Sequence, residues 1–178
     1  MIRRVLFVFF LIASVFVLIR HGENRRAILR DGTEMLLPVY VRKTERSGRA
    51  LQVRFHYYSL VPAAEIGTGG DTAVVHRHAG GRVSFVRMFD PSVPLRPREH
   101  LLRFRLSHKA GWSRSTESSR VDFASDVFTL RSADKTDAVL KRLKSAGVRF
   151  AVLKVDENGN AVLKGLADQN GVTLCERD

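Results

Sequence analysis

The 178-residue sequence predicts an α+β protein: one N-terminal transmembrane helix, then a small β-rich domain of antiparallel hairpins with one helix near the C-terminus. Three observations favour this fold class. An apolar run opens the chain, apolar and polar residues alternate through its middle, and a helical pattern appears near residue 140. We expect an anchor and juxtamembrane helix over 1–30, a β-rich domain over 31–170, and a C-terminal tail over 171–178.

The composition limits the kinds of protein that this chain can be. The chain is 44% hydrophobic and 27% charged, which excludes both a disordered and a wholly membrane-embedded chain. A net charge of +12 suits contact with anionic lipid or nucleic acid, but the charge is spread thinly and indicates mostly solvated surface. The single cysteine, Cys175, excludes an intrachain disulfide, and no cysteine follows the apolar run to carry a lipid.

The opening run, Val5 to Ile19, is apolar except for Ser14. As a helix it rises about 22 Å against a hydrocarbon core of ~30 Å, so it is long for a secretion signal and short for a span. Arginines at both ends can place their charges at the membrane interfaces, and no small-residue cleavage pattern fits. We therefore expect a retained anchor; the alternative is a cleaved signal that releases an exported soluble domain.

Four arginines follow the apolar run and are expected to contact lipid head groups: Arg20, Arg25, Arg26 and Arg30. A count of arginines places the C-terminal side in the cytoplasm. The short basic start followed by an apolar run has instead the layout of an export signal. Charge alone leaves the orientation open.

The helix is expected to continue to Arg30 and to end at Gly32. A first strand then follows, in which Pro38 suggests a sheet edge or a bend. Further along, Leu51, Val53 and Phe55 alternate with polar residues, as in a strand with one buried face.

Two hairpins and one helix complete the prediction. The first hairpin joins residues 72–78 to 82–88, and the second turns at Asn158-Gly159. Between them, residues 132–147 have a helical pattern with an apolar stripe of Val139, Leu140 and Leu143. The residues from 171 onward show no clear pattern and are expected to be loose.

The order of these pieces resembles the GDYXXLXY family of bacterial membrane-anchored proteins. The similarity runs from the anchor to about Leu166. It rests on the layout, on GTEMLL and GNAVLKGL, and on a degenerate motif in GRALQVRF where arginine and alanine replace the aspartate and tyrosine. The matching positions are Pro38, Arg42, Gly48, Val53, Phe55, Asp126 and Phe128.

The resemblance implies a single-pass protein of the bacterial inner membrane with its C-terminal domain on the periplasmic side. The family offers no established activity to transfer. If the missing aspartate carries the family's function, this chain lacks it.

Motifs for catalysis or metal binding are absent from the sequence. His76 and His78 share a strand face, but no further ligand is paired with them by spacing, and no C-x-x-C or H-E-x-x-H occurs. The glycines of GTGGDT match no phosphate-binding loop, and Ser113 in GWSRS lacks the second glycine of a nucleophile elbow. We predict no catalytic residue, cofactor or metal site.

The sequence therefore favours a non-enzymatic interaction or accessory domain at a membrane surface. Its expected partners are the lipid bilayer and another membrane protein, with no nucleic acid, although Arg54 and His56, and Arg103 and Arg105, form basic strand faces. The alternative is an exported hydrolase or metal-dependent enzyme whose site is assembled from separate strands. The oligomeric state is left open.

Overall fold

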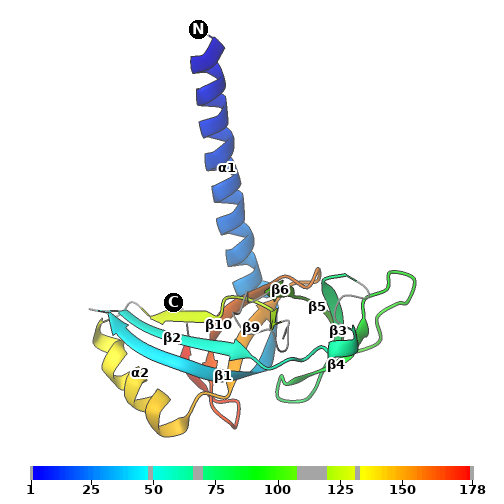
Figure 1. Ribbon diagram of the computed structural model, residues 1–178, viewed down its shortest axis with the longest axis vertical. Helices are drawn as coiled ribbons and strands as arrows, with labels where there is room; N and C mark the ends of the chain where they lie inside the picture. The colour runs from blue at the N-terminus through cyan, green and yellow to red at the C-terminus, as the bar shows by residue number, and fades with distance from the viewer. Residues whose placement is uncertain (1, 48–49, 66–69, 108–119, 131–132, 177–178) are drawn as a thin grey trace, which may run out of the picture.

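The structure is a computed structural model, and it describes residues 2–47, 50–65, 70–107, 120–130 and 133–176. A long helix, α1 (Ile2–Asp31), stands on a β-rich domain that extends to both sides of its base (Figure 1). A second, short helix, α2 (Ala133–Ala146), lies towards the C-terminus. The predicted fold class is confirmed to this extent: an α+β chain with an N-terminal helix and an antiparallel β-rich domain.

Within the described residues, the strands form three antiparallel sheets. The largest is a curved half-barrel of six strands in the order β11-β10-β9-β1-β2-β8, and the others are β4-β3-β5 and β6-β7. A short 3-10 helix, η1 (Ala63–Glu65), follows β2. The strands are β1 (Thr33–Ser47), β2 (Ala50–Tyr57), β3 (Thr72–Arg77), β4 (Val83–Met88), β5 (Glu99–Arg103), β6 (Arg105–Ser107), β7 (Arg120–Asp122), β8 (Val127–Leu130), β9 (Phe150–Val155), β10 (Ala161–Ala167) and β11 (Thr173–Glu176).

Strand β1 is central, so the suggestion that Pro38 marks a sheet edge is wrong. Residues 33–38 pair with β9, and residues 39–47 pair with β2. The Pro38 carbonyl accepts a hydrogen bond from the Tyr58 N–H, just beyond the end of β2. Because the N and O atoms of one strand residue point the same way, the missing N–H of Pro38 also faces this side. The proline therefore removes no bond from the β9 ladder.

The predicted alternation in β2 is confirmed. Leu51, Val53 and Phe55 are fully buried, while the residues between them are exposed or half-buried. Their side chains join one hydrophobic core shared by the six-stranded and the three-stranded sheets, to which the three-stranded sheet contributes Val75 and Leu102. Both predicted hairpins are present, as β3–β4 and as β9–β10.

Hydrogen bonds attach the turn of the β3–β4 hairpin to β1. The Leu36 N–H donates to the Gly81 carbonyl at 2.8 Å, and Arg77 Nε donates to the Glu34 carbonyl at 2.8 Å. The three-stranded sheet is therefore attached to the six-stranded sheet by hydrogen bonds to main-chain carbonyls as well as by the shared core.

The predicted second helix is confirmed, and it covers the sheet near β2 and β11. Leu143 is buried, and Val139 and Leu140 pack against the same core. Its apolar stripe is thus the face turned to the sheet, as the spacing predicts.

The C-terminal segment is not a loose tail. Residues 173–176 form β11, which pairs with β10, and both Leu174 and Cys175 are buried. Lys164 lies between two carboxylates, 3.1 Å from Glu34 and 3.0 Å from Glu176. The strand is short and flanked by polar residues, so its pairing depends on tertiary contacts that sequence periodicity does not reveal.

Helix α1 ends as predicted, at the residue before Gly32. The Gly32 N–H donates to the Ile28 carbonyl at 2.9 Å, and Lys154 Nζ donates to the Gly32 carbonyl at 3.0 Å. A Cβ atom on Gly32 would lie 2.5 Å from the Ile28 oxygen and 3.1 Å from backbone atoms of Val155. Ile28, one turn earlier, is buried against the domain. The base of the helix is therefore fitted closely to β9.

Within the residues that the structure describes, no helix combines the length and the apolarity that crossing a membrane requires. The predicted transmembrane helix is therefore not found in this part of the chain.

The fit at Gly32 leads to a prediction about stability. Gly32→Ala forces a methyl group against the backbone of Ile28 and Val155, so we expect the free energy of unfolding to fall by about 1–3 kcal/mol. Chemical denaturation of the full chain in neutral detergent, followed by circular dichroism, measures this change.

The matched control is Gly22→Ala, since a Cβ atom at Gly22 has no neighbour within 4 Å. In the middle of a helix this exchange is expected to stabilise by up to about 1 kcal/mol. Equal stability of the two variants would contradict the close fit of the helix base.

Candidate functional site

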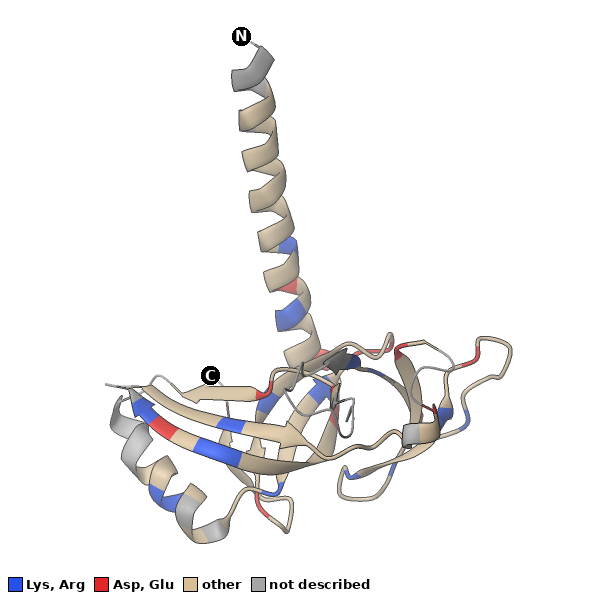
Figure 2. Cartoon of the chain, viewed as in Figure 1, with Lys and Arg blue, Asp and Glu red and all other residues tan. Residues whose placement is uncertain are grey.

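The upper part of α1 exposes an unusual amount of apolar surface. From Leu6 to Ile19 the helix carries no charged residue, and it projects away from the domain (Figure 2). Its described large apolar side chains are all between 46% and 74% exposed. Soluble surfaces rarely carry a contiguous apolar patch of this kind, so this surface indicates a binding or membrane-contact site.

The apolar surface surrounds the helix on all sides. Phe9, Phe10, Leu11 and Ile12 are consecutive and all exposed, and successive residues of an α-helix point about 100° apart. The one polar residue of the stretch, Ser14, satisfies its hydroxyl within the helix by donating to the Phe10 carbonyl at 2.8 Å. No polar face is left, so an apolar environment on every side suits this segment better than one flat surface.

The four arginines expected to contact lipid all lie on α1, below the apolar stretch. Arg30 lies 2.8 Å from Asp31 and lowers the pKa of that carboxyl by hydrogen bonding. Arg25 differs from the other three because it lines a groove in the domain surface. Arg26 and Arg30 lie on the opposite face of the helix, as their spacing from Arg25 and Ile28 requires.

A groove of about 730 Å³ lies at the base of α1. One wall is a single face of the helix, made by His21, Asn24, Arg25 and Ile28. Their spacing of three, four and seven residues places them in one stripe. Ile28 is buried at the lower end, and the polar residues above it face the open part of the groove.

The opposite wall comes from β5, β6, β7 and β10. Arg103 and Arg105 flank Phe104, which is only 2% exposed, so the two arginines share the outer face while the phenylalanine enters the core. Arg103 donates to Asn160 Oδ1 at 3.3 Å. Asn160 is itself held by Asp156, which accepts from its backbone N–H and its side-chain amide, both at 2.8 Å.

Two carboxylates also line the groove. Asp71 accepts a hydrogen bond from the Thr72 hydroxyl at 2.9 Å, and Asp122 is the cross-strand partner of Arg105. Among the described lining residues, three guanidinium groups thus face two carboxylates.

The positions that resemble the GDYXXLXY motif are structural where they are described. Val53, Phe55 and Phe128 are completely buried, with Val53 and Phe128 paired across β2 and β8. The Phe55 N–H donates to the Asp126 carbonyl at 3.0 Å. These residues therefore form core and strand pairing rather than a pocket.

The remaining motif positions lie on or near β1. Pro38 lies where β1 changes partner, and Arg42 is the extra residue of a bulge between Val41 and Lys43 in the β1–β2 ladder. Gly48 lies outside the described residues.

The histidines of the three-stranded sheet lie close together without forming a metal-ligand set. The rings of His76 and His78 meet edge to face at 4.9 Å, and His78 Nε2 lies 2.8 Å from Ser84 Oγ. The pKa of His100 is lowered, first by burial and then by Arg77 and His76. Within the described part of the chain, no three metal-ligating side chains gather. Ser113 and the first three residues of GTGGDT lie outside that part.

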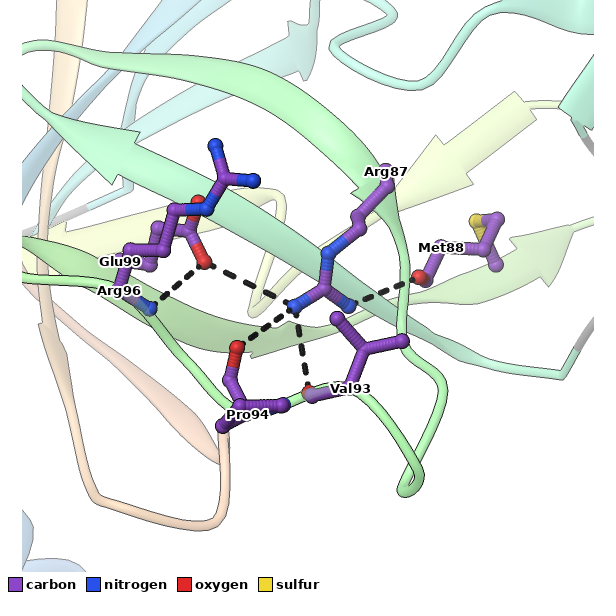
Figure 3. Close-up of polar contacts among 6 residues, drawn as sticks. All are labelled: Arg87, Met88, Val93, Pro94, Arg96 and Glu99. Atoms are coloured by element: carbon purple, nitrogen blue, oxygen red, sulfur yellow. Dashed lines mark hydrogen bonds and ion pairs between the residues drawn. The ribbon is translucent and has the colours of Figure 1, made fainter.

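A polar cluster holds the proline-rich loop between β4 and β5, residues 89–98 (Figure 3). Glu99, whose side chain is 6% exposed, accepts from the Arg96 N–H at 3.0 Å and lies 3.7 Å from Arg87. Arg87 also donates to the carbonyls of Val93 and Pro94, both at 3.4 Å. Arg87 and Glu99 thus hold the loop, together with Asp90, whose Oδ1 accepts from the Ser92 N–H at 2.8 Å and from the Ser92 hydroxyl at 2.7 Å.

The fixed loop displays apolar side chains. Phe89, Val93 and Leu95 are between 36% and 42% exposed, and Val86 of the preceding strand β4 is 40% exposed. These exposed apolar side chains belong to the domain rather than to α1.

Comparison with known proteins identifies no relative: no family model, no curated protein and no solved structure matches this chain.

Sequence reasoning missed the groove. In the sequence Arg103 and Arg105 indicate only a basic strand face, and nothing there connects them with His21 and Asn24. The spacing of His21, Asn24, Arg25 and Ile28 is a usable signal, because it marks one polar helix face that ends in an apolar contact.

The cluster in Figure 3 leads to a prediction. Arg87→Ala leaves the buried Glu99 carboxylate without its arginine and releases the loop carbonyls, so we expect a loss of about 1–3 kcal/mol in the free energy of unfolding. Arg96→Ala is the control, since Arg96 contributes its backbone N–H, and it should stay within about 0.5 kcal/mol of the wild type. Similar losses in both variants, measured by denaturant titration, would show that the ion pair does not fix the loop.

Cys175 provides a prediction about pH. Burial raises its pKa from 9.0 to about 12, so at pH 8 its thiolate fraction is ~1,000-fold lower in the folded than in the unfolded chain. Labelling with a thiol reagent should therefore be slow until denaturant is added. Since the unfolded chain releases this proton first, the thiol also lowers stability as the pH rises above about 9. Equally fast labelling with and without denaturant would contradict the burial of β11.

Proposed function

We propose that this protein is membrane-anchored and that its β-rich domain is a non-enzymatic interaction or accessory domain held at the membrane surface. The observation that carries the proposal is the apolar stretch of α1, which is exposed around the whole circumference of the helix. Water is an unfavourable environment for this surface, at roughly 25 cal/mol per Å² of apolar area. A bilayer covers all sides of the helix at once.

The boundary between apolar and charged residues supports this anchoring. The apolar stretch stops at Ile19, and the first following residue is Arg20, whose long side chain can reach the interface while its stem remains in lipid. Arg25, Arg26 and Arg30 then lie at increasing distance from the hydrocarbon. The resemblance to the GDYXXLXY family supports the bacterial inner membrane with a periplasmic domain.

The accessory role of the domain is supported by the loop of residues 89–98. It carries exposed apolar side chains but is fixed by Arg87 and Glu99, so a partner pays little ordering entropy when it binds there. We propose that another membrane protein contacts this loop. A binding role is also consistent with a sequence in which no catalytic spacing was found.

Flotation of the purified full chain with neutral phosphatidylcholine vesicles tests the anchoring. We expect the wild type to float with the vesicles and to resist extraction by alkaline carbonate. The double variant Phe10→Arg, Phe16→Arg places two charges in the apolar stretch and should stay in the dense fraction, since each costs about 2.5–3.5 kcal/mol in lipid.

Val172→Arg is the matched control, because Val172 is 60% exposed but lies on the domain. It should float as the wild type does. A wild-type chain that remains soluble without vesicles or detergent, or a double variant that still floats, would refute the anchoring.

A further inference from the structure

We propose that the groove at the base of α1 binds the phosphate of an anionic lipid head group, of the phosphatidylglycerol type. The inference rests on the proposed anchoring, because the lipid reaches the groove from the bilayer in which α1 is held. It goes beyond a general attraction of basic residues to the membrane, since it assigns one lipid to one site.

The groove lies at the correct height. Arg25 is six residues beyond Ile19, which corresponds to a rise of about 9 Å along the helix. The head-group layer on each side of a bilayer is roughly 5–8 Å thick. With the apolar stretch in the hydrocarbon and Arg20 at its boundary, His21, Asn24 and Arg25 lie in or just outside the head-group layer.

The groove also faces a single side of the helix. Arg25 lines it, whereas Arg26 is turned about 100° away and Arg30 is paired with Asp31. A lipid beside the helix at this face meets protein on two sides, the helix itself and the strands of the opposite wall.

The far wall presents its arginines from rigid elements. Arg103 and Arg105 are fixed in the backbone by the burial of Phe104 between them, and the Arg103 side chain is held by Asn160. Guanidinium groups suit phosphate because their planar N–H donors can form paired hydrogen bonds to two oxygens. Arg25 and Arg103 therefore supply the phosphate contacts from opposite walls.

The two carboxylates favour a head group that also carries hydroxyls. Asp122 faces Arg105 across the β6–β7 ladder, and Asp71 accepts from Thr72 while retaining further acceptor sites. The glycerol hydroxyls of phosphatidylglycerol can donate to such acceptors, whereas a choline group has no donor. This distinguishes the expected ligand from a neutral lipid of the same size.

Native mass spectrometry of the full chain, released from neutral detergent micelles doped with phosphatidylglycerol or phosphatidylcholine, tests the proposal. We expect one phosphatidylglycerol retained by the wild type and at least about tenfold less of it by the variant Arg25→Gln, Arg103→Gln. The control variant Arg26→Gln, Arg96→Gln removes the same charge away from the groove and should retain the lipid. Inorganic phosphate is added in a separate arm.

Each outcome either supports or overturns the head-group site. Equal retention of both lipids by the wild type, equal loss in both variants, or full displacement by inorganic phosphate would overturn a lipid head-group site. The groove variant should still float with neutral vesicles, so failure of the head-group site and failure of the anchoring are read from different experiments.

Discussion

The structure depends on how the base of α1 is seated on the sheet. Ile28 is buried against the domain, and Gly32 approaches the backbone of Val155 so closely that no side chain fits between them. Lys154 closes the junction by donating to the Gly32 carbonyl. Because β1 begins at the next residue, the direction of the helix and the start of the central strand are set together. The groove exists only because the helix is held in this direction.

Strand β1 connects the base of α1 to the rest of the domain. It pairs first with β9 and then with β2, and the change of partner occurs at Pro38. A proline is tolerated there because its missing N–H would face the end of β2. One strand thereby joins the half of the sheet under the helix to the half that carries β8. The hairpin β3–β4 is attached to the same strand through Leu36 and Glu34.

Much of this fold could be predicted from periodicity, because burial of one face of a strand or helix produces a regular spacing of apolar residues in the local sequence. Leu51, Val53 and Phe55 alternate as a half-buried strand must, and the stripe of Leu140 and Leu143 marks the buried face of α2. The position of β11 and the central place of β1 could not be predicted. Both depend on which strands meet, and strand pairing between distant segments has no local signature. The groove was missed for the same reason, since its arginines come from helix and strands far apart in sequence.

The charged residues are arranged in a definite order along the axis of α1. A net charge of +12 spread along a chain indicates little, but the arrangement around α1 is ordered: an apolar stretch, then Arg20, then a basic groove at the level of Arg25. A rigid connection to the sheet keeps this order fixed relative to the β-rich domain, which a flexible linker would not do. The same rigidity fixes where the loop of residues 89–98 stands, because its sheet is bonded to β1 and β1 to the helix. If the protein is anchored as proposed, a partner in the same membrane would meet this loop at one height and orientation, which lowers the entropic cost of a small contact.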